Sequence, residues 1–346
     1  MTESGVRPPL ALTMGEPAGI GGEIALKAWA EARVKAGANG AVPPFVLLDD
    51  PARLEALAVR LGLPVPVRAV GSMAEGAALF GAALPVLPQP LAAPVTPGRP
   101  DPANGAAVIA SIDRAVELVR RGEASAVVTN PIQKSALYAA GFRHPGHTEY
   151  LAHLAGLTAG LTGEPVMMLA AQDLRVVPVT IHVSVRDAVP LVTREAILHA
   201  GRVTAAALAR DFGIARPRLA VAALNPHAGE GGAMGREEID VIAPAVADLR
   251  AEGIDAVGPK PADTLFHAAA RRGYDAALCM YHDQALIPLK TIDFDTGVNI
   301  TLGLPFVRTS PDHGTALDIA GTGKAGASSL IAALTTADAM AARRRA

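Results

Sequence analysis

Three histidines that are far apart in the chain share one kind of position. His182, His227 and His282 stand at or just after the ends of the apolar stretches 179–181, 218–224 and 276–281. In parallel α/β sheets the carboxyl ends of the strands lie along one edge, so side chains placed there can converge. Neutral imidazole binds zinc and similar divalent ions, and three protein ligands leave coordination positions open for a substrate. A single histidine is more often a hydrogen-bonded structural residue, so it is the shared position of the three that predicts a metal site.

A second group of polar residues follows His282. Asp283 can either orient the His282 ring from its far side or cap the helix that comes next. Lys290, Asn299 and Arg308 lie in a span rich in glycine, proline and apolar residues, which predicts a non-helical context. A lone lysine or arginine is usually a solvated surface cation, but these three donor types together suit a phosphate or a carboxylate. The sequence therefore predicts an anion site close in sequence to a candidate metal ligand.

His147 and Thr148 begin a predicted helix directly after Gly146. A His-Thr pair at a helix start can donate hydrogen bonds to an anionic ligand. The alternative, in which Thr148 is only the N-cap, carries equal weight. The sequence supplies no supporting partners for four further histidines, which are assigned no function: His144, His153, His199 and His267.

The glycine-rich segment 13–23 lies between a predicted strand and a predicted helix. Such a turn can present backbone N–H groups to an anion. Pro17 interrupts the G-x-G-x-x-G dinucleotide fingerprint, however, so a tight structural turn is the preferred interpretation.

The composition excludes several classes of function. The 346 residues include 31 Lys and Arg against 33 Asp and Glu, which leaves no broad electrostatic footprint for nucleic acid or an anionic membrane. Cys279 is the only cysteine, so no internal disulfide can form. The N-terminal residues lack the apolar segment of a secretory signal, and no apolar run reaches the length of about 18 residues that a membrane span needs. These features predict a cytoplasmic protein.

Short apolar runs alternate with amphipathic stretches of helical length, which is typical of parallel α/β architecture. The predicted strands are residues 10–14, 44–48, 124–128, 218–224 and 275–281. The clearest predicted helices are residues 51–63, 105–121, 193–212, 236–252 and 327–343. Residues 164–171 and 174–183 flank Gln172-Asp173 and are predicted to form an antiparallel hairpin, which makes the expected sheet mixed.

Seven prolines fall between Pro85 and Pro102. Proline lacks a backbone N–H and has a restricted φ, so this composition disfavours both a helix and a central strand. The segment from Leu84 onward is therefore predicted to be an extended surface connection within one domain.

Several sequence blocks resemble those of the 4-hydroxythreonine-4-phosphate dehydrogenases of vitamin B6 synthesis, along nearly the whole chain. The blocks are residues 15–21 (GEPAGIG), 146–149 (GHTE), 224–230 (LNPHAGE), 261–266 (PADTLF), 280–284 (MYHDQ), 298–305 and 312–318 (DHGTALD). Their order and number make the resemblance specific. Segment 129–134 departs from the form found in some members of the family.

The resemblance implies an α/β fold like that of isopropylmalate dehydrogenase, with two α/β/α lobes, mixed and mainly parallel sheets, and a cleft between the lobes. Residues 1–130 plus 290–346 would form lobe one, on the cofactor side. Residues 131–289 would form lobe two, with the metal ligands and the dimer contacts. A homodimer with a shared active site is also implied.

The resemblance also assigns roles to individual residues. It implies one divalent metal, zinc typically and magnesium or cobalt alternatively, bound by His182, His227 and His282. Substrate contacts carry over to His147, Thr148, Lys290, Asn299 and Arg308. Residues 313–321 are similar to a stretch that contacts the adenosine of NAD or NADP in the wider group, which implicates His313, Gly314 and Asp318. Lys290 and Asp283 are the candidate catalytic residues, with Lys290 serving either proton transfer or phosphate neutralisation.

The expected reaction is the NAD(P)-dependent oxidation of 4-phosphooxy-L-threonine to a β-keto acid, which decarboxylates to 3-amino-2-oxopropyl phosphate. Two alternatives remain among dehydrogenases: a phosphorylated threonate or erythronate as substrate, or an aromatic dihydrodiol. Outside that class, a metal-dependent phosphate-ester hydrolase or a phospho-metabolite binder uses the same residue types.

Overall fold

The computed structural model describes residues 7–34, 42–144, 146–157 and 164–345. Two compact units make up the chain, Met1–Ala155 with Leu304–Ala342 (unit 1) and Gly156–Gly303 with Arg343–Ala346 (unit 2). Both are α/β units, which confirms the predicted fold class. None of the described helices is long and apolar enough to cross a membrane.

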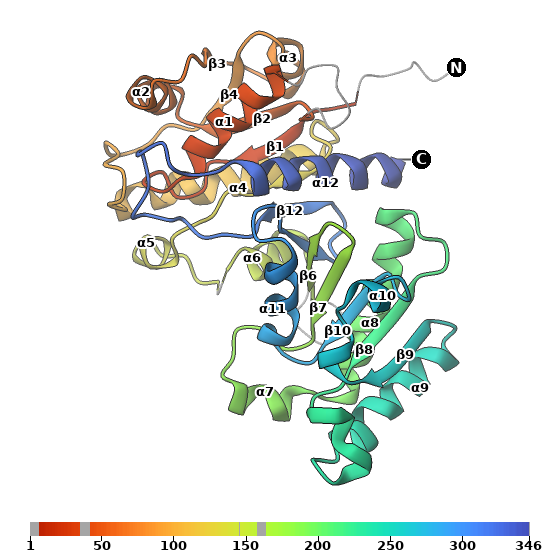
Figure 1. Cartoon of the computed structure of the whole chain (residues 1–346). Coiled ribbons are helices and arrows are strands. Elements are labelled where there is room, and N and C mark those ends of the chain that lie inside the picture. The colour runs from red at the N-terminus through yellow and green to blue at the C-terminus, as the bar shows by residue number, and fades with distance from the viewer. Residues whose placement is uncertain (1–6, 35–41, 145, 158–163, 346) are drawn as a thin grey trace, which may run out of the picture. The chain divides into compact units, whose positions relative to one another are not determined.

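Unit 1 contains a parallel sheet in the order β3-β4-β2-β1-β5-β12 (Figure 1). Its strands are β1 (Leu10–Thr13), β2 (Phe45–Asp49), β3 (Val67–Ala69), β4 (Leu84–Pro88), β5 (Val127–Val128) and β12 (Arg308–Pro311). Its helices are α1 (Gly21–Val34), α2 (Pro51–Leu61), α3 (Met73–Leu79), η1 (Pro102–Asn104), α4 (Gly105–Arg120), α5 (Lys134–Ala139), α6 (His147–Leu154) and α12 (Ser328–Arg345). Local sequence sets several of these bounds. For example, Asp50 caps α2 through the Arg53 N–H, and Gly62 ends it in a left-handed conformation.

Strand β4 corrects the prediction for the proline-rich segment. Residues 84–87 are buried and lie between two strands, with Val86 opposite both Leu47 of β2 and Ala69 of β3. Successive residues of a strand direct their N–H groups to opposite neighbours. Pro85 faces β2 one residue before that pairing begins, and Pro88 faces β3 after that pairing has ended. Each missing N–H therefore falls where no ladder bond is needed, so the prediction of no central strand was wrong.

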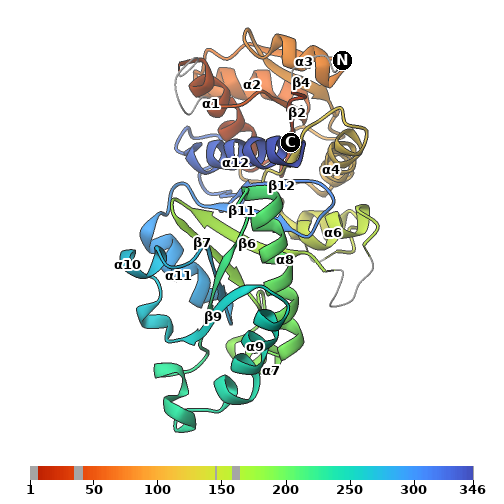
Figure 2. The ribbon, with the colours of Figure 1, turned by 90° about the vertical axis from the view of Figure 1, so that its right-hand side faces the viewer.

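Unit 2 contains a mixed sheet in the order β11-β6-β7-β10-β8-β9, in which β6 pairs antiparallel with β11 and β7. Its strands are β6 (Val166–Ala171), β7 (Leu174–Pro178), β8 (Arg218–Ala222), β9 (Asp255–Lys260), β10 (Ala276–Cys279) and β11 (Val298–Leu302). Its helices are α7 (Val185–Leu191), α8 (Arg194–Phe212), η2 (Pro226–Gly232), η3 (Glu238–Ile242), α9 (Ala243–Ala251), η4 (Ala262–Thr264), α10 (Ala268–Arg271) and α11 (His282–Ile292). The predicted hairpin at Gln172-Asp173 is confirmed as β6–β7. In Figure 2 this sheet lies between α11 on one side and α8 on the other.

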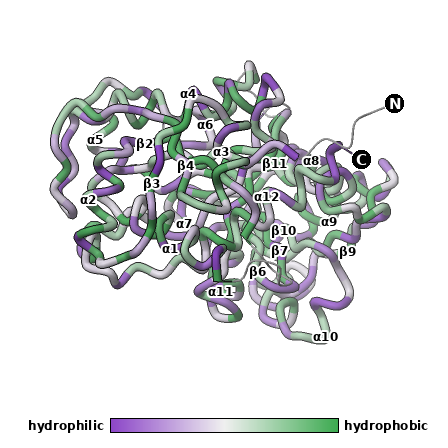
Figure 3. The backbone as a smooth tube through the Cα atoms, turned by 90° about the horizontal axis from the view of Figure 1, so that it is seen from above, coloured by the Kyte–Doolittle hydropathy of each residue, from purple (hydrophilic) through white to green (hydrophobic). Residues whose placement is uncertain are grey.

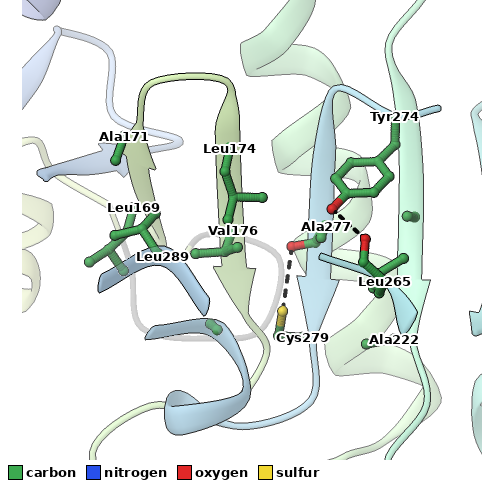
Figure 4. Packing of buried hydrophobic residues seen from close by; sticks show 12 residues of the cluster. Leu169, Ala171, Leu174, Val176, Ala222, Leu265, Tyr274, Ala277, Cys279 and Leu289 are labelled. Atoms are coloured by element: carbon green, nitrogen blue, oxygen red, sulfur yellow. Dashed lines mark hydrogen bonds between the residues drawn. The ribbon is translucent and has the colours of Figure 1, made fainter. Parts of the chain in front are cut away.

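The core of unit 2 forms where α11 covers β6, β7 and β10. Leu169, Val176 and Leu289 are at most 1% exposed and pack in this cluster (Figure 4). Tyr274 donates its hydroxyl hydrogen to the Leu265 carbonyl, which satisfies a buried polar group. Cys279 is fully buried, and burial raises the pKa of its thiol, so it acts as a small apolar residue. Figure 3 shows the alternation of hydrophobic and hydrophilic stretches along the chain that produces such buried faces.

The two units end at different residues from the predicted lobes. The predicted boundaries were 130/131 and 289/290, whereas unit 1 continues to Ala155 and unit 2 to Gly303. Helices α5 and α6 stay with unit 1 because they pack on α4, where the Tyr150 hydroxyl bonds the Asp113 carboxylate. Residues 290–302 stay with unit 2 because α11 covers its sheet and β11 pairs with β6.

Candidate functional site

The three predicted metal ligands follow three neighbouring parallel strands of unit 2. Strand β10 lies between β7 and β8 and runs parallel to both. His182 comes after β7, His227 after β8 and His282 after β10. The placement of these residues at one edge of a parallel sheet, expected from the sequence, is therefore present in the topology.

The loops after β7 and β10 remain hydrogen-bonded beyond the strands, and this brings two histidines together. Thr180 donates to the Met280 carbonyl through its hydroxyl at 2.8 Å. The ring centroids of His182 and His282 are 5.9 Å apart. Two imidazoles at this separation can supply nitrogen donors to one divalent ion.

Asp283 orients the His282 ring. His282 Nδ1 lies 2.7 Å from Asp283 Oδ1, and α11 has Tyr281 rather than Asp283 as its N-cap. A carboxylate that accepts from Nδ1–H leaves Nε2 with its lone pair available for a metal. Of the two roles considered for Asp283, orientation of the ring is the one that the structure displays.

Gln284 is a positioning residue that sequence reasoning missed. Its buried amide accepts from the Met280 N–H at 2.7 Å and donates to the Ala223 carbonyl at 2.7 Å. It thereby ties the end of β10 to the end of β8, the two strands that lead to His282 and His227. The available signal in the sequence was a glutamine directly after Asp283, at the start of the predicted helix.

His227 occupies an unusual backbone conformation. Residues 227–231 all have positive φ, and three of them, His227 (φ 50°), Ala228 (φ 53°) and Glu230 (φ 44°), are not glycine. Such conformations cost about 1–3 kcal/mol each and persist only where the surroundings over-determine them. The segment around His227 is thus a strained left-handed turn, of the kind that is concentrated at functional sites.

A three-residue metal cluster is not preassembled within one chain. Among the described residues, no group of three or more His, Cys, Asp or Glu side chains is placed to hold a metal ion. The His182–His282 pair is suited to an ion, with His227 on the next strand end. The three-histidine metal site stays a prediction.

A separate group of polar residues gathers in unit 1 at the start of α6. His147 and Thr148 are the first two residues of this helix, and its N-cap is Gly146, which has no side chain to satisfy the first N–H groups. The alternative role for Thr148, as the N-cap, is therefore wrong. Two charged side chains lie beside this end, because a Cβ on Gly146 would be 3.4 Å from Glu149 Oε2 and 3.7 Å from Lys134 Nζ. Helix N–H groups and a lysine at one point favour an anion.

Arg308 adds a buried cation to this group. It is 4% exposed at the start of β12, and its guanidinium donates to Thr129 Oγ1 at 2.6 Å. Burial lowers the pKa of Arg308 to about 10, although the Glu149 carboxylate acts in the opposite direction. The side chain stays charged at neutral pH in a site that disfavours a cation, which is the condition under which a bound anion contributes most.

His147 is a neutral donor or acceptor beside that cation. Burial, and then the charges of Arg308 and Lys134, hold the pKa of His147 well below its ordinary value. Its Nε2 atom is buried and lacks a hydrogen-bond partner among the described residues. A buried polar atom without a partner points to a missing ligand atom. His147, Arg308 and Lys134 together form a group of side chains that we name the anion cluster.

Lys290 and Asn299 belong to unit 2, and their predicted context is corrected. Lys290 lies in the last turn of α11, with Nζ 5.5 Å from the centre of the Phe294 ring, and Asn299 lies in β11. The predicted non-helical context is therefore wrong at Lys290. Helix α11 continues through Pro288 and includes Lys290. The predicted anion donors are divided between the two units, with Arg308 in unit 1.

The predicted cofactor residues follow β12. His313 Nδ1 lies 3.0 Å from the Gly314 carbonyl, while its Nε2 is buried without a partner among the described residues. Asp318 is exposed. The same stretch ends at Gly321, which lines a cavity of about 640 Å³ in unit 1. Its walls include Asp50, Leu57, Arg60, Val95 and Pro97.

The glycine-rich turn is structural, as preferred from the sequence. Gly15 has φ 68°, and a Cβ there would lie 2.6 Å from both Asn130 Cβ and the Pro131 carbonyl oxygen. Asn130 Nδ2 donates to the Thr13 carbonyl at 3.0 Å and so closes the turn from the other side. Only glycine fits this close approach of two backbones.

The four histidines without an assigned function have structural surroundings. His144 and His153 pack with Phe142 and Tyr150 in a ring cluster, with 5.0 Å between the two imidazole centroids. His199 Nε2 lies 2.8 Å from the Glu164 carbonyl, and His267 caps α10.

Comparison with known proteins identifies the family. The family model described as pyridoxal phosphate biosynthetic protein PdxA matches residues 41–337. The chain belongs to the PdxA family. A 4-hydroxythreonine-4-phosphate dehydrogenase from Methylorubrum populi is 59% identical over 97% of this chain and 95% of its own. One from Caulobacter vibrioides is 57% identical over 97% of this chain and 98% of its own. The resemblance and the enzyme class predicted from the sequence, an oxidoreductase of the dehydrogenase type, are thus confirmed.

Solved structures support the same placement. A 4-hydroxythreonine-4-phosphate dehydrogenase from Klebsiella pneumoniae has a TM-score of 0.83 at 39% identity, covering 96% of this chain and 99% of its own. A terephthalate 1,2-cis-dihydrodiol dehydrogenase from Burkholderia xenovorans has a TM-score of 0.62 at 31% identity, covering 95% and 97%. This second neighbour has the type of substrate that was the unphosphorylated alternative among dehydrogenases, so the choice of substrate depends on the site itself.

Proposed function

We propose that this PdxA-family chain oxidises 4-phosphooxy-L-threonine with NAD or NADP and a divalent metal ion, as a step of pyridoxal phosphate biosynthesis. The observation that carries the proposal is the anion cluster of unit 1. A buried arginine, a neutral histidine, a lysine and the start of α6 suit a phosphate. A dihydrodiol has no phosphate to offer to the buried Arg308 guanidinium, so the cluster favours a phosphorylated substrate.

The histidines of unit 2 would hold the metal. Nε2 of His282 is the free ring nitrogen when Nδ1 is held by Asp283, and the His182 ring lies beside it. A bound divalent ion, zinc or else magnesium or cobalt, supplies a Lewis acid that lowers the pKa of the substrate hydroxyl.

The chain's own residues position and neutralise the substrate. Arg308 and His147 would bind phosphate oxygens, with Thr148 and Asn299 as further donors. Lys290 would either accept a proton or neutralise the phosphate. A bound nicotinamide would supply the hydride acceptor for oxidation of the secondary alcohol, and a base would take the hydroxyl proton. Loss of carbon dioxide from the β-keto acid, followed by protonation at carbon, would give 3-amino-2-oxopropyl phosphate.

The cofactor would bind in unit 1. The cavity beside Gly321 is lined by apolar side chains, among them Leu57, Val95 and Pro97, and by the charged side chains of Asp50, Arg53 and Arg60, a combination that suits a base together with polar groups. Arg60 donates to the Gly321 carbonyl at 3.1 Å. His313, Gly314 and Asp318 belong to residues 313–321, the stretch that ends at Gly321. The position of the cavity supports the proposal that these residues contact the adenosine of the cofactor.

We also propose a homodimer with a shared site in the cytoplasm. Unit 2 exposes apolar side chains on and around α7 and η3, which suit a partner surface: Val185, Val189, Leu191, Met234 and Ile239. A partner chain would supply the third imidazole that one chain does not bring to the His182–His282 pair. The lone buried cysteine is consistent with a reducing compartment.

Steady-state activity of metal-stripped protein tests the reaction. The substrate is 4-phosphooxy-L-threonine, and each divalent ion is added back in turn. The absorbance of the reduced nicotinamide is followed with NAD and with NADP in separate assays. Activity is expected only after an ion is added. Full turnover after exhaustive chelation, or turnover of a dihydrodiol but not of the phosphorylated amino acid, would overturn the proposal.

Mixing two inactive variants tests the shared site. His227→Ala and His282→Ala are each expected to be inactive. If the two imidazoles of one site come from different chains, a hybrid dimer has one intact site, so a random mixture regains about a quarter of the wild-type activity. A mixture that stays inactive, although hybrid dimers are shown to form, contradicts the shared site.

A further inference from the structure

We propose that Glu238 is a positioning residue that presets His227 for the metal ion by holding the left-handed turn 227–231; this inference rests on the proposed metal function. Neither the motifs of the sequence nor the predicted site contains this residue. Its carboxylate contacts residues on both sides of His227.

The Glu238 carboxylate holds the residues that lead into the turn. It is 3% exposed. One oxygen, Oε1, accepts from the N–H groups of Leu224 and Asn225, both at 2.8 Å. The other, Oε2, accepts from Asn225 Nδ2 at 3.0 Å. A buried carboxylate is costly unless it is hydrogen-bonded, so these three donors and this acceptor hold one another in place.

The same carboxylate also limits the turn from its other end. A Cβ on Gly229 would lie 2.6 Å from Glu238 Oε2, so the backbone at Gly229 passes directly against this oxygen. Gly229 has φ 77°, in the middle of the left-handed run. His227 lies between Asn225, which is hydrogen-bonded to the carboxylate, and Gly229, which packs on it. Its strained φ is therefore determined from both sides.

The helix that presents Glu238 is itself unusual. Glu238 begins η3, a π-helix of five residues, Glu238–Ile242. π-Helical turns are rare, and those that occur are frequently found at functional sites. Glu238, whose carboxylate contacts the turn, is the first residue of this one. The strain of the turn, the three donors and the π-helix are separate observations that converge on one residue.

Metal binding by the chelator-treated full chain tests the inference, with Co²⁺ alone as the probe. Glu238→Ala removes the carboxylate, and Gly229→Ala leaves the carboxylate in place but pushes the turn away from it. Both are expected to weaken Co²⁺ binding by about 10- to 100-fold, as for other residues that orient metal ligands, and to alter the visible spectrum of bound cobalt. Asp240→Asn is the matched control, because Asp240 lies in the same π-helix, is exposed, and bonds Arg236. It is expected to bind Co²⁺ like the wild type.

A purely structural role would change the melting temperature without changing the metal site. Wild-type Co²⁺ affinity and spectrum in Glu238→Ala and Gly229→Ala, with a lowered melting temperature, would overturn the inference. If Glu238→Ala does not fold, Gly229→Ala and Glu238→Gln decide, and unchanged affinity in both overturns it. The variant His282→Ala distinguishes failure of the proposed metal function from failure of the positioning role of Glu238. If this variant binds Co²⁺ normally, the proposed metal function fails. If it loses Co²⁺ while the Glu238 and Gly229 variants do not, only the positioning role fails.

Discussion

Replacement of Arg308 by methionine is expected to raise stability while it removes activity. The fall in the pKa of Arg308 from its ordinary value to about 10 corresponds to roughly 3 kcal/mol by which the folded protein disfavours the charged guanidinium. Because the folded-state pKa is the lower one, this penalty is fully present below pH 10 and is relieved only above it. Loss of the bond to Thr129 costs about 1 kcal/mol. The net gain of about 1–2 kcal/mol should raise the melting temperature by about 2–8 °C.

The effect of Arg308→Met on catalysis should be in the opposite direction. Truncation of one partner of a buried charge pair costs about 2–5 kcal/mol, so kcat/KM for the phosphorylated substrate should fall by about 30- to 5,000-fold. A residue that serves folding alone would not give higher stability together with lower activity when it is replaced. A buried charge that serves a ligand would give both changes, because stability and function compete at such sites.

Two assays measure the opposed effects. Differential scanning calorimetry reports stability with and without inorganic phosphate, which should raise the melting temperature of the wild type but not of the variant. Steady-state kinetics reports kcat/KM. Arg121→Met is the control for the loss of one cation, because Arg121 is an exposed helix end paired with Glu117. A variant at Arg308 that keeps kcat/KM but melts at a lower temperature would refute the reasoning.

Three further predictions concern the other parts of the site. Bound phosphate should raise the lowered pKa of His147, so phosphate binding should take up protons at His147 and this contribution should strengthen as the pH falls; calorimetry in buffers of different ionisation enthalpy measures the uptake. Asp283→Asn removes the charged partner of His282 Nδ1 and should weaken zinc binding by about 10- to 100-fold, as measured by competition with a chelating dye. Gly15→Ala forces a Cβ to within 2.6 Å of Asn130 and should cost about 2–4 kcal/mol in urea unfolding.

Matched variants separate these effects from nonspecific ones. Asp187→Asn, an exposed aspartate bonded to Ser184, should leave zinc binding unchanged. Gly122 has φ 74°, but a Cβ added there would meet no described atom within 4 Å, so Gly122→Ala isolates the cost of the backbone conformation. Phosphate binding without proton uptake would contradict the first prediction. Equal zinc affinities of Asp283→Asn and Asp187→Asn would contradict the second. An equal loss of unfolding free energy in Gly15→Ala and Gly122→Ala would contradict the third.

The amino-acid sequence alone was enough to predict most of the alternation of strands and helices, whereas the roles of the site residues stay predictions. Alternating apolar runs and amphipathic stretches predicted α2, α4, α8, the hairpin β6–β7 and the strands that precede the histidines. These features are local, because hydrophobic periodicity and caps depend on neighbours in the chain. The positions of His182, His227 and His282 after strands were visible for the same reason.

Which of these elements meet is set by long-range packing and was found only in the folded protein. This packing placed β10 between β7 and β8, and so brought His182 beside His282. It joined Arg308 to His147 and Lys134, and it set the Glu238 carboxylate under the turn of His227. Such contacts depend on strand register and on the approach of distant backbones, neither of which leaves a periodic trace in the chain. Strand β4 illustrates the same limit, since its prolines are tolerated only because the neighbouring strands start and stop at the right residues.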